Sequence, residues 1–105
     1  MVIPPFLPLR AAAPDGACSS YLLESDSAET KLLIDAGTGS LARLMEAARP
    51  ETLTGVVLTH LHFDHMSDLL PMQYALQFSH RERPLPVFLP RQPERVRALL
   101  ECPYY

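Results

Sequence analysis

The 105-residue chain has no tryptophan, four glycines, two cysteines and no run of basic residues. Cys18 and Cys102 lie far apart and form no Cys-x-x-Cys pair, so neither a disulfide framework nor a cysteine metal site is expected. The most basic stretch, HRER at 80–83, contains its own acid, so charge does not indicate a nucleic-acid-binding face. No apolar run approaches the roughly 20 residues that span a membrane.

The remaining composition is that of one small globular domain, with 48% hydrophobic residues, 20% charged residues and a formal net charge of -3. The apolar N-terminus, MVIPPFLPLR, has no basic start and contains three prolines, so it does not have the pattern of a signal peptide. We therefore expect a soluble cytoplasmic protein with two free thiols and no membrane partner.

Hydrophobic patterning predicts alternating strands and helices after an irregular or extended lead-in over residues 1–17, which lacks a first strand. Strands are expected at 19–24, 31–35, 55–59 and 87–89. Helices are expected at 40–49, 66–79 and 92–101. The first two strands form a hairpin, and the short apolar runs of the last two indicate burial on both faces. Thr38 or Ser40 is expected to cap the first helix, which ends before Pro50. This order predicts an α/β fold with helices covering a sheet.

The stretch VVLTHLHFDH, residues 56–65, places three of the four histidines directly after a predicted strand. Because residues two apart on an extended segment point to the same side, His60 and His62 can offer two imidazoles to one ion. Asp64 and His65 follow where the loop turns into a helix, and they can serve a second ion close by. Imidazole and carboxylate are the ligands of zinc, manganese and iron in hydrolytic sites. We therefore favour a metal site over a polar surface loop with incidental histidines.

The segment THLHFDH resembles the His-x-His-x-Asp-His motif of the metallo-β-lactamase-fold hydrolases. The resemblance extends upstream through CSSYLLE and LLIDAGTG, covers most of residues 17–90, and is closest to the ribonuclease Z-like and cyclic-phosphodiesterase-like branch. It implies a four-layer αββα sandwich, of which residues 1–105 would form one partial domain, the N-terminal half. That branch commonly has a Gly-Leu pair soon after the motif, where this chain has Asp68-Leu69.

The resemblance also implies roles for individual residues. His60 and His62 would bind a first metal ion, and Asp64 and His65 a second, with Asp64 also catalytic. Zn²⁺ is the expected metal, with Mn²⁺ or Fe²⁺ as alternatives. Asp35 would support the metal loop by accepting a hydrogen bond from a ligand histidine or a loop amide, and capping of the next helix is its alternative role. The implied activity is hydrolysis of a phosphodiester by a metal-bound hydroxide.

Other residues carry weaker expectations. Gly37 and Gly39 are expected to permit a tight turn, with no site role as the alternative. His80 is expected to be a solvated histidine. Tyr74 and Phe78 are expected to pack in the core or at its rim.

The implied fold is considerably longer than this chain, and its second half supplies a further histidine, a bridging aspartate and a final histidine. No aspartate follows Asp68, and only His80 is left over. The alternative function is therefore a truncated, non-catalytic metal-binding module, or a half that needs a partner chain. The expected substrate is a small phosphodiester or other ester, with nucleic acid left open. Without the second sheet, exposed apolar surface predicts self-association.

Overall fold

A computed structural model describes residues 6–10, 18–27 and 29–105. A five-stranded sheet has the order β1-β2-β3-β4-β5. Its strands are β1 (Phe6–Arg10), β2 (Cys18–Glu24), β3 (Lys31–Ile34), β4 (Gly55–Val57) and β5 (Val87–Phe88). The helices are α1 (Ser40–Ala47), α2 (Phe63–Met66), α3 (Leu69–Gln77) and α4 (Glu94–Ala98), with a 3-10 turn, η1 (Pro50–Thr52). Strands β1 to β3 pair antiparallel, and β3 to β5 pair parallel.

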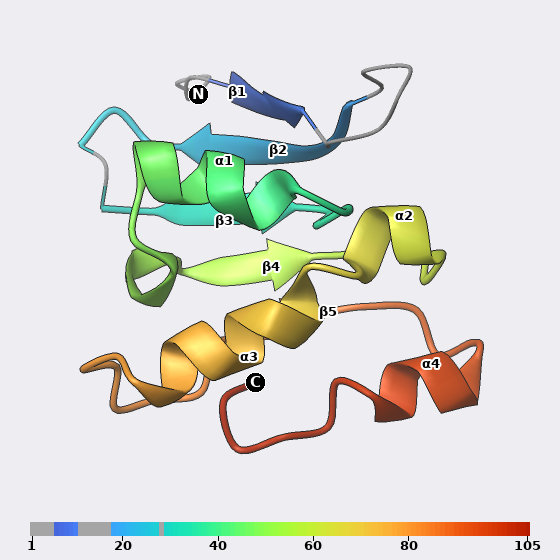
Figure 1. Cartoon of the computed structure of the whole chain (residues 1–105). Coiled ribbons are helices and arrows are strands. Elements are labelled where there is room, and N and C mark those ends of the chain that lie inside the picture. Colours follow the sequence, from blue (N-terminus) through green and yellow to red (C-terminus); the bar gives the residue numbers. More distant parts are fainter. Residues whose placement is uncertain (1–5, 11–17, 28) are drawn as a thin grey trace.

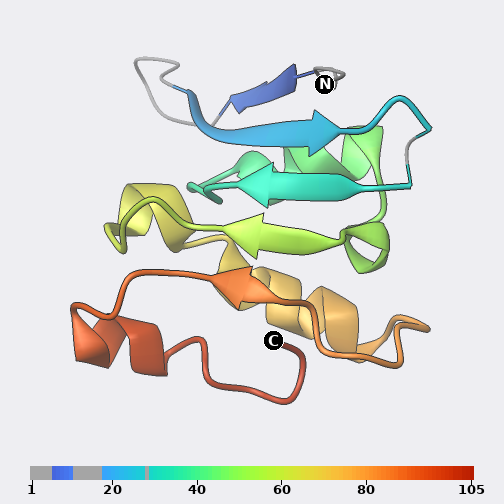
Figure 2. The same ribbon diagram turned by 180° about the vertical axis from the view of Figure 1, so that it is seen from behind.

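The described part of the chain forms two layers. Helices α1 and α3 lie across one face of the sheet in Figure 1, and Figure 2 shows the opposite face with no helix across it. Alternate strand residues point to opposite faces, so Leu22, Leu33 and Val56 are buried beneath the helices. The next residues along β4 and β5, Val57 and Phe88, pair in register on the uncovered face. Phe88 is 62% exposed, so burial of β4 and β5 on both faces was a wrong prediction.

The N-terminal lead-in contains a strand that the sequence did not indicate. Residues 6–10 form β1 at the edge of the sheet, where Pro8 is aligned with Tyr21 of β2. Proline has no backbone N–H to donate, and an edge strand tolerates it because one side of that strand has no neighbour. The expectation of no first strand was therefore wrong, while residues 1–5 and 11–17 lie outside the described residues.

The single helix expected over 66–79 is two helices, α2 and α3. Pro71 lies in the first turn of α3, where a missing N–H costs no intrahelical hydrogen bond. The buried side of this region consists of Met66, Leu69, Met72 and Leu76. Leu70 and Phe78 are exposed, as is Leu99 after α4. No helix among residues 6–10, 18–27 and 29–105 is long and apolar enough to cross a membrane.

Candidate metal centre

The candidate site lies at the edge of the sheet where the parallel strands β3 and β4 end. Strand β4 continues into a loop anchored by Leu58 and Leu61, which are both buried. The intervening residues face outward, and α2 begins directly after His62 (Figure 1). Because β3 and β4 run parallel, Asp35 after β3 and the loop after β4 meet at the same edge.

The ring of His60 contacts those of both other motif histidines. The ring centroids of His60 and His62 are 4.6 Å apart in an edge-to-face arrangement, and those of His60 and His65 are 3.9 Å apart. Oδ2 of Asp64 lies 3.5 Å from Nε2 of His65, although the Asp64 side chain is 76% exposed. The structure therefore links the four residues predicted as metal ligands through pairwise contacts, from His60 to His62 and His65 and from His65 to Asp64.

Asp35 connects the end of β3 to the histidine loop. Its backbone has a φ of 61°, a left-handed conformation that aspartate adopts more readily than most residues. The buried Ser20 hydroxyl donates to the Asp35 carbonyl at 2.6 Å, and the Asp35 N–H donates to Val57 O at 2.8 Å. These bonds hold the backbone in a conformation that directs the side chain toward the loop after β4.

The Asp35 carboxylate accepts hydrogen bonds from both partners that were expected. Oδ1 accepts the backbone N–H of Thr59 at 2.7 Å, and Oδ2 lies 3.1 Å from Nδ1 of His65. Oδ2 also accepts the Thr59 hydroxyl at 2.8 Å, a contact that sequence reasoning missed. The sequence feature that could have indicated this contact is the threonine directly before the first motif histidine. The Asp35 side chain therefore bonds to Thr59 and His65 and does not cap α1, which was its alternative role.

The start of α1 is held by the side chain of Asp68, a residue that follows the histidine motif. Gly39, with a φ of 89°, is the N-cap residue of α1, and the predicted caps do not act as such. The hydroxyl of Ser40 is buried without a hydrogen-bond partner among the described residues, and that of Thr38 bonds to Ser67 at 2.7 Å. Instead, Oδ2 of Asp68 accepts the N–H of Leu41 at 2.8 Å. The Asp68 that departs from the family pattern therefore joins the motif segment to α1.

The tight turn predicted at Gly37 and Gly39 is confirmed, since Ser40 N donates to Gly37 O at 3.0 Å and Gly39 has positive φ. His80 is exposed, as predicted. Tyr74 and Phe78 are not in the core: they are 66% and 69% exposed and contact each other with ring centroids 5.0 Å apart. The outer side of α3 therefore carries an exposed aromatic pair.

The donor atoms match zinc chemistry but do not complete a coordination sphere. Within the described ranges 6–10, 18–27 and 29–105, no group of three or more His, Cys, Asp or Glu side chains is arranged to hold a metal ion. A catalytic zinc usually takes three ligands from protein. The described residues therefore offer imidazole and carboxylate donors of the right chemistry, but no complete three-ligand set.

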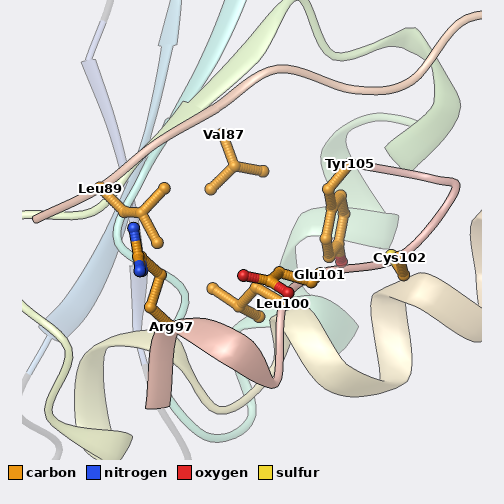
Figure 3. A pocket seen from close by; sticks show the side chains of 7 residues that line it. All are labelled: Val87, Leu89, Arg97, Leu100, Glu101, Cys102 and Tyr105. Carbon is orange, nitrogen blue, oxygen red and sulfur yellow. The ribbon is translucent and has the colours of Figure 1, made fainter. Parts of the chain in front are cut away.

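A pocket of about 420 Å³ lies away from these residues, between β5, α4 and the C-terminal segment (Figure 3). It is lined by Val87, Leu89, Arg97, Leu100, Glu101, Cys102 and Tyr105. The Tyr105 hydroxyl donates to the Leu69 carbonyl. Burial, and then the neighbouring Cys102 thiol, raise the pKa of Tyr105 above its ordinary value, which keeps this donor protonated. No motif residue lines the pocket, so it is not the candidate metal centre.

Known proteins resemble this chain in both sequence and structure. It is 40% identical over 65 residues to the probable metallo-hydrolase YhfI of Bacillus subtilis, covering 62% of this chain and 26% of that protein. It is 37% identical over 79 residues to ribonuclease Z of Methanopyrus kandleri, covering 74% of this chain and 28% of that protein. The chain thus spans about a quarter of the length of these relatives.

Two solved structures have the same fold over nearly the whole chain. The crystal structure of YhfI from Bacillus subtilis matches with a TM-score of 0.78 and 28% identity, covering 94% of this chain and 42% of that one. Human tRNase Z, short form, matches with a TM-score of 0.68 and 25% identity, covering 90% and 36%. The mixed α/β fold predicted as part of a larger sandwich is therefore confirmed. Residues 13–101 match the family described as the metallo-beta-lactamase superfamily, and the chain belongs to that superfamily.

Proposed function

We propose that the chain carries the N-terminal part of a metal-dependent hydrolase centre, in which His60 and His62 bind one divalent ion and Asp64 and His65 a second. The observation that carries the proposal is the contact of three histidine rings beside the Asp35 carboxylate, which bonds one of them. The superfamily supports it, because its members generally bind divalent metals such as zinc. Zn²⁺ is the proposed metal, with Mn²⁺ and Fe²⁺ as alternatives.

The chain's own residues position the donors. When bound, a divalent ion supplies Lewis-acid chemistry and a nucleophile that is active near neutral pH. Asp35 holds Nδ1 of His65, which leaves Nε2 of that ring on the side facing Asp64. The exposed Asp64 carboxylate is the proposed catalytic residue, since it can approach an ion without breaking a buried contact.

Elemental analysis and Zn²⁺ titration of the purified chain test the metal site. The double variant His60→Ala/His62→Ala should lose most of the bound zinc, because one ion loses both of its donors and the second loses the neighbouring half of the site. His80→Ala is the matched control, since this histidine is also exposed but lies outside the motif, and it should bind zinc as the wild type does. Unchanged zinc content in the double variant would remove the basis of the proposal.

The proposed substrate class is a phosphodiester. Three relatives are named ribonuclease Z, and the backbone linkages of RNA are phosphodiesters. With a net charge of -3, this chain has little means of attracting a long RNA by itself, so we propose a small phosphodiester or a similar ester. In an assembly that completes the site, bis(p-nitrophenyl) phosphate should be cleaved faster than lactones, thioesters or β-lactams. A clear preference for a lactone or thioester would instead assign another ester chemistry.

The second candidate function is a metal-binding module without catalysis. It is favoured by the lack of any three-donor group among residues 6–10, 18–27 and 29–105. Zinc binding without hydrolysis of any ester, even when the missing donors are supplied by a second chain, would support this module. Turnover under the same conditions would support the hydrolase.

A further inference from the structure

Thr59 precedes the histidine motif and belongs to no set of metal donors, yet its polar groups connect the site. Its backbone N–H donates to Oδ1 of Asp35 at 2.7 Å. Its hydroxyl is 2.8 Å from Oδ2 of Asp35 and 2.9 Å from Nδ1 of His60. One side chain therefore lies between the carboxylate that bonds His65 and the imidazole of His60.

We infer that Thr59 is a positioning residue whose hydroxyl fixes the tautomer of His60, so that Nε2 of His60 is the nitrogen left for a metal ion. The inference rests on the proposed metal-binding function. It deepens that function by assigning a role to a residue outside the motif.

The proton assignment follows from counting donors. A carboxylate accepts hydrogen bonds and donates none, so the single Thr59 hydroxyl proton is directed to Oδ2 of Asp35. This bond is preferred to one with a neutral ring nitrogen, because hydrogen bonds to charged acceptors are the stronger ones. The Thr59 oxygen can then only accept from His60, which places the ring proton on Nδ1. In the neutral imidazole, Nε2 then carries the lone pair.

One carboxylate thereby serves two histidines. His65 reaches Oδ2 of Asp35 directly at 3.1 Å, and His60 reaches it through the Thr59 hydroxyl. In both rings Nδ1 forms a hydrogen bond within the protein, and Nε2 is the nitrogen that remains for a metal ion. Partners of this kind fix ring orientation and strengthen metal ligands, and their loss typically costs about 10–100-fold in metal affinity.

Two substitutions separate the hydroxyl from the shape of the side chain. Thr59→Val removes the hydroxyl but keeps the branched shape, and Thr59→Ser keeps the hydroxyl. Thr59→Ala replaces the valine variant if that variant does not fold. The metal-free chain, labelled with ¹⁵N-histidine, is examined by magic-angle-spinning NMR in mildly alkaline buffer, where free imidazole is neutral. This measurement distinguishes protonated from unprotonated ring nitrogens and does not depend on the association state of the chain.

In the wild type and in Thr59→Ser, His60 should carry its proton on Nδ1. In Thr59→Val it should show a tautomer mixture or a proton on Nε2. The His65 tautomer should stay unchanged throughout, since its contact with Asp35 is direct. Zinc affinity should fall about 10–100-fold in Thr59→Val and be retained in Thr59→Ser.

The outcomes distinguish this inference from the proposed function. A wild-type His60 protonated on Nε2, or the same His60 tautomer in the valine and serine variants, would overturn the role of Thr59 even if zinc binds. A hydroxyl-dependent tautomer in a chain that binds no zinc would support the role of Thr59 while refuting the metal function.

Discussion

At the residue scale, Asp35 shows how a single side chain organises the site. A left-handed backbone costs roughly 1–2 kcal/mol for a residue with a Cβ, somewhat less for aspartate. Hydrogen bonds from Ser20 and to Val57 hold the backbone there, and the carboxylate gains three donors from Thr59 and His65. The conformation persists because the groups around Asp35 fix both its backbone and its side chain.

Tyr105 provides a residue-scale test through pH. Burial raises the pKa of its phenol, so the unfolded chain loses this proton above about pH 10 while the folded chain retains it. Stability should therefore fall as pH rises above about 10, and Tyr105→Phe should weaken this dependence. At neutral pH the same variant should lose about 1 kcal/mol with the bond to the Leu69 carbonyl. Urea denaturation at several pH values measures both effects.

The matched control for this variant is Tyr74→Phe on the exposed side of α3, which should stay within about 0.5 kcal/mol of the wild type at neutral pH. An alkaline profile of Tyr105→Phe identical to that of the wild type would show that Tyr105 is not protected from ionisation by folding.

At the scale of elements, α1 depends on a carboxylate that follows the motif. Asp68 accepts the Leu41 N–H in the first turn of α1, while Gly39 and Ser40 provide no side-chain cap. Asp68→Ala should therefore destabilise the chain by about 1 kcal/mol, the usual cost of removing a helix cap. Thermal unfolding followed by circular dichroism measures this loss.

Glu46→Ala is the control for the Asp68 variant, because the exposed Glu46 carboxylate forms an ion pair with Arg43 at 3.8 Å on the surface of α1. Such pairs contribute about 0–1 kcal/mol, so the control should be close to the wild type. Equal stability of the Asp68 and Glu46 variants would mean that the Asp68 contact contributes nothing to folding.

At the scale of the whole molecule, one face of the described sheet has no helix across it (Figure 2). Val57 and Phe88 lie side by side on this face, which no helix covers in Figure 2. We predict that the chain self-associates through this face and has little or no hydrolase turnover by itself. Val57→Lys/Phe88→Lys should reduce association in sedimentation velocity experiments by placing charges on the apolar face.

The double variant Tyr74→Lys/Phe78→Lys is the control for this face, since it changes two exposed aromatic residues on the helical side instead. It should associate like the wild type. A monodisperse wild-type monomer with robust metal-dependent turnover would contradict the prediction. If only the control variant associated less than the wild type, the contact surface would instead be assigned to α3.

The sequence by itself determined the family, the order of most strands and helices, and the four candidate ligands. These features depend on residues close together in the chain: apolar periodicity, turn residues, and four polar donors within His60–His65. The ligand roles remain predictions, whereas the proximity of these side chains is observed. Local spacing was sufficient because the motif lies in one loop directly after a single strand.

Only the tertiary structure decided which residues support that loop. The Thr59 hydroxyl meets Asp35 across 24 positions, and Asp68 meets Leu41 across 27, so both contacts depend on how the folded chain brings distant segments together. The place of β1 in the sheet depended on pairing with β2, and its proline is acceptable because β1 is an edge strand of the described sheet. Composition likewise did not decide whether Tyr74 and Phe78 are exposed, because burial of a helix side depends on what the folded chain packs against it.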